Sequence, residues 1–80
     1  MKKLTALLSK ILKIKEENIH DDLTPSQVAS WDSMNALVLV AELEKTYNIR
    51  FTMAEVIGVK CVGDIKKILK NHGVDLENDE

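Results

Sequence analysis

The chain has 80 residues, of which 45% are hydrophobic and 30% charged, and its formal net charge is −2. This composition describes one small globular domain, near the lower size limit for folding without disulfides or metal. A core of this size leaves few apolar residues for the walls of a deep catalytic cleft, which favours a binding or carrier module over an enzyme. The weak charge balance does not indicate a nucleic-acid partner. No apolar run approaches the ~20 residues that a membrane-spanning helix needs.

The cysteine indicates the cellular compartment, and the acidic residues indicate where the domain ends. Cys61 is the only cysteine, and no Cys/His cluster has metal-ligand spacing, so we expect a cytoplasmic protein without a disulfide or a metal site. Four of the last six residues are acidic, and Leu76 is the only apolar residue among these six. We therefore expect a folded domain over 1–74 and a solvated, disordered tail over 75–80.

The N-terminal half predicts one long helix and one long loop. A helix over 3–14 is indicated by leucine and isoleucine at helical spacing, with lysines elsewhere on the wheel. The periodicity then fails until Trp31. Within this loop, residues 24–27 form a capping-box pattern with proline at the first helical position, which predicts a short helical turn near 25–29. Four apolar residues are spaced as anchors to the core, namely Ile19, Leu23, Val28 and Trp31.

The C-terminal half predicts two longer helices and a short one between them. The first begins at Asp32 or Ser33 and ends near Tyr47, before Asn48, which tolerates the left-handed conformation. Its expected core face consists of Leu37, Val40, Ala41, Leu43 and Tyr47. A second capping box over 52–55 opens the short helix. The last helix begins near 62–64 and ends before Gly73, with its core face at Val62, Ile65, Ile68 and Leu69. The fold class is therefore an all-α bundle of three longer helices and a short one.

Ser33 is the candidate for chemistry, because it falls on the first turn of the most apolar helix. The N-terminus of a helix carries a partial positive charge that favours a phosphate attached to the hydroxyl. His20 and His72 do not form a recognisable catalytic triad with this serine. No catalytic residue is therefore assigned, and Ser33 is expected to be the substrate of another enzyme.

The residues around Ser33 resemble the acyl carrier protein family. The resemblance rests on Trp-Asp-Ser-Met at 31–34, which contains the Asp-Ser-Met attachment motif, on the segment 37–51 that follows, and on the Val-Gly-Asp-Ile element at 62–65. It extends backwards through 14–19 and covers about residues 3–72. The motif alone would be a weak signal, but the three elements together are specific. The resemblance implies the four-helix fold of acyl carrier proteins, with a long loop between the first two helices.

The resemblance also implies a cofactor and partners. In this family a phosphopantetheinyl transferase moves 4′-phosphopantetheine from coenzyme A to the motif serine, here Ser33, and the terminal thiol holds acyl groups as thioesters. The other partners are enzymes that load and transfer the acyl group, and a monomer is expected. Asp32 matches the aspartate beside the serine, which caps the helix and helps the transferase to dock.

The chain departs from the family's fatty acid carriers in its charges. Those carriers present an acidic stripe on the second helix, and most of the matching positions here are not acidic. We expect an apolar partner-recognition face instead, formed by Met34, Val38, Met53, Val56 and Ile57 beside Asp32. A weak internal cavity lined by Leu37, Val40 and Ile57 is a further hypothesis. The Trp-Asp-Ser variant at 31–33 and the depleted acidic face resemble specialised carriers of secondary metabolic, lipid-modifying or aminoacyl pathways more than a housekeeping carrier.

Three alternatives remain open from the sequence. D-alanyl and other aminoacyl carriers share the Asp-Ser-Met motif, so the cargo need not be a fatty acyl chain. An unmodified helical interaction module could present Met34 and Val38 to a partner helix. A helix-turn-helix DNA binder would need a basic recognition helix, whereas the candidate helix carries only Lys45 against Glu42 and Glu44.

Overall fold

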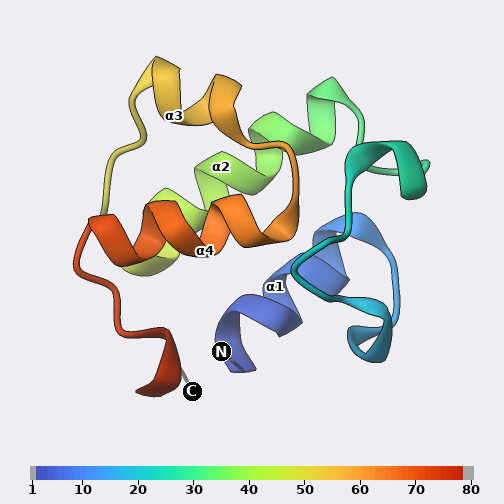
Figure 1. Cartoon of the computed structure of the whole chain (residues 1–80), viewed down its shortest axis with the longest axis horizontal. Helices are drawn as coiled ribbons and strands as arrows, with labels where there is room; N and C mark the ends of the chain where they lie inside the picture. The colour runs from blue at the N-terminus through green and yellow to red at the C-terminus, as the bar shows by residue number, and fades with distance from the viewer. Residues whose placement is uncertain (1, 79–80) are drawn as a thin grey trace.

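The computed structural model describes residues 2–78, and over these residues the chain is helical and contains no strand. Four α-helices and three short 3₁₀ turns follow one another along the chain: α1 (Lys2–Leu12), η1 (Glu16–Asn18), η2 (Pro25–Gln27), α2 (Ser33–Tyr47), α3 (Met53–Gly58), α4 (Val62–Asn71) and η3 (Leu76–Asn78). A long loop joins α1 to α2 (Figure 1). The predicted all-α bundle with one short helix is confirmed, whereas the turn η1 was not predicted.

Helices α1 and α4 bury the faces that their periodicity predicts. In α1 the side chains of Leu4, Leu8 and Leu12 are buried, while Leu7 and Ile11 are half-buried at the edge of the core. In α4 all four predicted core residues are buried. Both helices carry their lysines at positions that the apolar stripe does not use, so the sequence pattern has one interpretation only.

The predicted core face of α2 is partly wrong. Leu37 is 63% exposed and Ala41 is also exposed, whereas Leu39, which was not predicted, is buried together with Leu43. Apolar residues occupy every position from 36 to 41, so the sequence does not mark a single stripe. The helix also has neighbours on more than one side: α1 packs against it, and Figure 1 shows α3 and α4 on its other sides.

The loop between α1 and α2 is anchored to the rest of the fold by buried side chains and by backbone hydrogen bonds. Three of the four predicted anchors, Leu23, Val28 and Trp31, are buried, and Ile19 is half-buried. The backbone N–H groups of Val62 and Gly63 donate to the carbonyls of Leu23 (3.0 Å) and Asp21 (2.9 Å). Two donors of the first turn of α4, which lack partners within the helix, are thus satisfied by the loop.

The first part of the acidic tail differs from the expectation. Over 75–78 the chain is ordered: Leu76 is 2% exposed and belongs to the core, and Asp75 accepts hydrogen bonds from Glu77 and Asn78. Burial of Leu76, with Val74 packed beside the core, holds this turn against the bundle by removing apolar side chains from water. The core therefore extends beyond residue 74, and residues 79–80 lie outside the described part of the chain.

Candidate functional site

The start of α2 holds Ser33 in a defined position. The carboxylate of Asp32 accepts a hydrogen bond from the backbone N–H of Asn35 (2.8 Å), which makes Asp32 the N-cap, as the sequence predicted. The side-chain amide of Asn35 donates in turn to the carbonyl of Ser30 (2.6 Å). These bonds fix the angle at which the loop enters the helix, and Ser33 is the first helical residue and is exposed.

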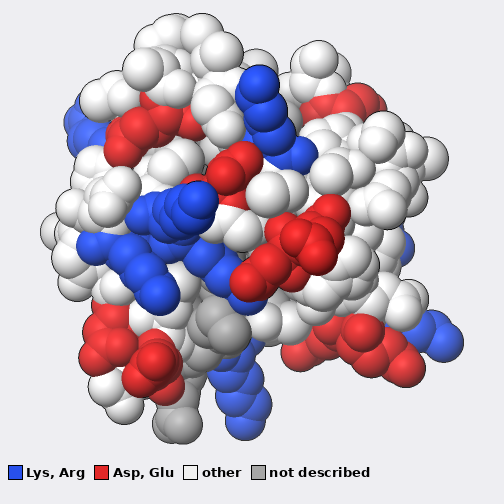
Figure 2. Space-filling model, in the orientation of Figure 1, with Lys and Arg blue, Asp and Glu red and all other residues white. Residues whose placement is uncertain are grey.

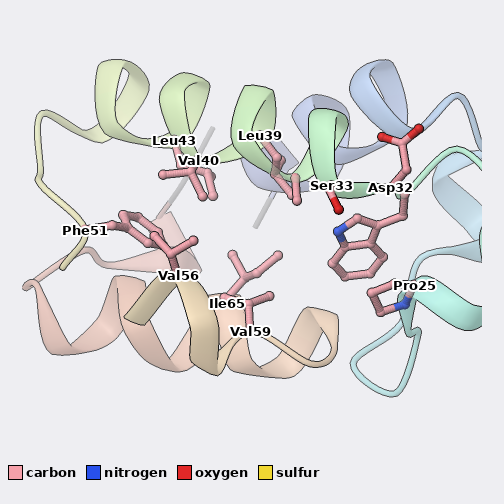
Figure 3. A pocket seen from close by; sticks show the side chains of 12 residues that line it. Pro25, Asp32, Ser33, Leu39, Val40, Leu43, Phe51, Val56, Val59 and Ile65 are labelled. Carbon is pink, nitrogen blue, oxygen red and sulfur yellow. The ribbon is translucent and has the colours of Figure 1, made fainter. Parts of the chain in front are cut away.

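A cavity of about 380 Å³ begins at Ser33 and extends between α2 and the helices α3 and α4. Figure 3 shows the Ser33 hydroxyl at one end of this space, Phe51 at the other, and Ile65 and Val59 on the wall opposite α2. The lining residues are Pro25, Trp31, Asp32, Ser33, Ala36, Leu39, Val40, Leu43, Phe51, Val56, Val59 and Ile65.

Most side chains in the walls of the cavity are hydrocarbon. Asp32 is the only charged residue among them, and its carboxylate points away from the cavity (Figure 3) while it caps the helix. A cavity had been predicted around Leu37, Val40 and Ile57, but only Val40 lines it. Leu37 and Ile57 are 63% and 72% exposed, because they lie on the outer surfaces of α2 and α3.

Most of the predicted partner-recognition residues are exposed. Met34 (74%), Met53 (73%) and Ile57 extend into solvent from α2 and α3, two of the helices beside the cavity, and Val38 is 44% exposed. Val56 is different, since it is half-buried and lines the cavity. Large apolar side chains this exposed gain nothing for the fold, so they are available for contact with another molecule.

Helix α3 is joined to the end of α4 by polar contacts that the sequence did not reveal. Thr52 and Glu55 form the predicted capping box, and the carboxylate of Glu55 also lies 3.0 Å from the Nε2 atom of His72. The His72 ring stacks on Phe51, with 6.2 Å between the ring centroids. The backbone N–H of Thr52, followed by the His72 side chain, lowers the pKa of Glu55. Because Phe51 and Val56 line the cavity, these contacts hold one of its walls.

The surface over α4 carries charges of both signs. Figure 2 shows lysine and acidic side chains intermixed on this face, and a shallow hollow there is lined by Asp21, Asp22, Asp64, Lys66, Lys67 and Lys70 together with Cys61 and Gly63. Asp21 forms an ion pair with Lys66, and the hydrogen bond from that lysine lowers the pKa of Asp21. Charges that neutralise one another in this way do not form a basic patch for nucleic acid.

Comparisons with known proteins agree with this geometry. The family model described as "Phosphopantetheine attachment site" matches residues 2–69, which is most of the chain. The chain belongs to this family of phosphopantetheine carriers. Its cofactor is therefore covalently attached 4′-phosphopantetheine, and its partners include a transferase that attaches the arm and enzymes that use it.

A solved structure described as a "putative acyl carrier protein" from Mycobacterium tuberculosis has the same fold as this carrier. The TM-score is 0.79 at 21% sequence identity, and the alignment covers 89% of this chain and 95% of the other. No curated protein matches the chain significantly.

The start of α2 fits the cofactor. An exposed hydroxyl at the first helical residue is accessible to an enzyme, and the partial positive charge of the helix N-terminus favours a phosphate there. The apolar cavity beside it offers space for whatever the arm carries. Within residues 2–78 no cluster of three or more His, Cys, Asp or Glu side chains could hold a metal ion, and no helix is long and apolar enough to cross a membrane.

Proposed function

We propose that this carrier transports acyl intermediates on a phosphopantetheine arm attached to Ser33 and delivers them to separate biosynthetic enzymes. One observation supports this function above the others. The exposed hydroxyl at the first residue of α2 lies at the end of an apolar cavity, within a chain that belongs to the phosphopantetheine family. When bound, the arm supplies a thiol that holds an acyl group as a thioester.

The protein's own residues present the serine and do not activate it. His72 is paired with Glu55, and Phe51, on which its ring stacks, lies at the far end of the cavity from Ser33 (Figure 3). Asp32 uses its carboxylate to cap the helix. This arrangement supports a non-catalytic carrier, in which Ser33 is the nucleophile in a reaction that the transferase catalyses and Asp32 orients the helix that bears it.

The polarity of the cavity supports an acyl cargo over an aminoacyl cargo. A D-alanyl group carries an ammonium, and moving an unpaired charge into a hydrocarbon-lined space is strongly unfavourable. The one carboxylate at the cavity, on Asp32, points away from it (Figure 3). An alkyl chain, in contrast, gains about 0.8 kcal/mol for each CH₂ group that it buries.

The exposed apolar side chains suggest how partner enzymes bind. We propose that Met34, Val38, Met53 and Ile57 contact partners through apolar surface beside Asp32, with Val56 acting from the cavity wall. Binding of this kind depends weakly on ionic strength, because few charges are brought together. It fits a specialised carrier, and we propose that it acts as a cytoplasmic monomer, in keeping with its single free cysteine.

The test is the intact mass of the protein after incubation with coenzyme A, Mg²⁺ and a broad-specificity phosphopantetheinyl transferase. We expect a single phosphopantetheine addition in the wild type and in Ser26→Ala, which changes another exposed serine near the cavity, and none in Ser33→Ala. If the folded wild type gains no mass, the carrier function is wrong and the unmodified interaction module takes its place. An addition that persists in Ser33→Ala places the arm elsewhere.

A further inference from the structure

Trp31 lies in the cavity wall directly before the residues that define the site. It is 5% exposed and lines the cavity together with Asp32 and Ser33. Its backbone N–H donates to the carbonyl of Val28 (2.9 Å), which fixes the main chain at this point. From the sequence, Trp31 is expected to anchor the loop to the core through its apolar ring. That role accounts for the ring but not for its polar atom.

The indole N–H of Trp31 has no acceptor within the protein. Tryptophan has one polar side-chain atom, and this atom can only donate. Within residues 2–78 no carbonyl or side chain accepts a hydrogen bond from it, and no polar side-chain atom is sealed in the core without a partner. Because no such atom is sealed, the N–H is in contact with open space, and Trp31 lines the cavity that begins at Ser33.

A hydrogen-bond donor in this position differs from most of the cavity wall. Beyond Asp32 and Ser33, the remaining lining side chains are hydrocarbon and hold a chain by contact alone, without fixing its depth or orientation. A single polar group in an apolar pocket supplies the missing orientation. Its partner must be an acceptor, and an oxygen covalently tied to Ser33 is held close to it.

We propose that the indole N–H of Trp31 donates a hydrogen bond to an oxygen of the group attached to Ser33, and so positions the loaded arm in the cavity. This inference rests on the proposed function, because it requires an arm on Ser33. The acceptor belongs either to the arm itself, at its phosphate or amide oxygens, or to the carbonyl of the acyl thioester. Trp31 is thus a positioning residue for the cargo and takes no part in bond making.

The chain contains one tryptophan, so its indole ¹⁵N–¹H resonance is a single assigned signal in a spectrum of the whole protein. We would record this signal for the unmodified, phosphopantetheinylated and hexanoyl-loaded forms, after intact mass has confirmed each form. A downfield proton shift with slower exchange against water in the phosphopantetheinylated form identifies an acceptor on the arm. The same change only after hexanoyl loading identifies the thioester carbonyl. An indole signal that is unchanged in both modified forms overturns the inference.

The mass measurement separates this inference from the proposed function. If Ser33 gains no mass, the proposed function has failed. If Ser33 is modified and the indole signal does not move, only the role of Trp31 has failed.

The variant Trp31→Phe keeps an aromatic ring and removes the donor. Without this positioning the hexanoyl thioester leaves the cavity for water more often. We therefore expect its spontaneous hydrolysis to be about threefold to tenfold faster than in the wild type, the range that corresponds to one lost hydrogen bond. The control is Phe51→Leu, which alters an apolar wall at the other end of the cavity and removes no donor. Hydrolysis of Trp31→Phe at the wild-type or the control rate contradicts the positioning role. Should the variant fail to fold, the spectra of the wild type still decide the question.

Discussion

Replacing Asp32 separates its part in the fold from its part in recognition. Its carboxylate accepts the backbone N–H of Asn35 at 2.8 Å, and this bond satisfies one of the unpaired donors at the start of α2. Asp32→Ala removes both the acceptor and the negative charge. Asp32→Asn keeps an acceptor in the same place and removes only the charge.

The expected loss can be estimated from these two contributions. Removal of an N-cap acceptor costs about 0.5–2 kcal/mol of the free energy of unfolding. A domain of this size has a total stability of about 4–12 kcal/mol, and each 1 kcal/mol lowers its melting temperature by about 4–8 °C. The charge by itself contributes about 0.3–1 kcal/mol through the helix dipole, and salt screens this part. We therefore expect a clear loss for Asp32→Ala and a smaller, salt-sensitive loss for Asp32→Asn.

Thermal unfolding at low and high salt measures these losses, and the rate of phosphopantetheine addition measures recognition in the same variants. Asp32→Asn should stay folded at the assay temperature, so any slower addition reports the loss of the carboxylate to the transferase. An unchanged melting temperature in Asp32→Ala refutes the capping argument. So does a loss in Asp32→Asn that equals the loss in Asp32→Ala at high salt.

Three further predictions concern the core, the α3 contacts and the cavity. Leu8→Ala, at a fully buried site, should lower the free energy of unfolding by about 2–5 kcal/mol in urea titrations, whereas Leu37→Ala, at an exposed site, should change it by less than about 0.5 kcal/mol; equal losses would contradict the assigned burial. The N–H of Thr52 lowers the pKa of Glu55 in the folded state, so the Glu55 carboxylate stabilises the fold above the ordinary pKa of a glutamate, and this effect disappears as the pH falls through the lowered value. Urea midpoints measured from pH 2.5 to 6 should therefore fall less steeply towards acid in Glu55→Gln than in the wild type. Parallel curves for the two proteins would oppose this. Val40→Phe extends a side chain into the open space of the cavity, so it should lower the free energy of unfolding in urea titrations by less than about 1 kcal/mol. The same enlargement in a filled core would lower it by about 1–3 kcal/mol. A loss within this second range would show that the cavity is closed.

The sequence predicted those elements whose pattern allows a single interpretation. The helices α1 and α4 have one apolar stripe each, and both capping boxes, at Thr24 and Thr52, open the turns that were expected there. The left-handed residue Asn48 follows α2 with a φ of 55°. In each case the information lies within a few neighbouring residues, so no knowledge of the tertiary structure was needed.

The errors occur where tertiary contacts decide. Helix α2 is apolar on several sides, so only its neighbours determine that Leu39 is buried and Leu37 exposed. The cavity could not be placed for the same reason, because its walls come from α2, α3, α4 and the loop. The contact between Glu55 and His72 joins residues 17 positions apart, and no local pattern announces it.

The two hydrogen bonds between the loop and α4 affect the order in which the protein can assemble during translation. Val62 and Gly63 are synthesised about 30 residues after Ser33, yet their N–H groups hold the loop that leads into the helix of Ser33. Ser33 therefore emerges from the ribosome well before Val62 and Gly63, which hold the loop beside it. A nascent chain at that stage can form α1 and much of α2, but it does not yet offer the folded surface around the serine, so attachment of the arm should follow the emergence of α4.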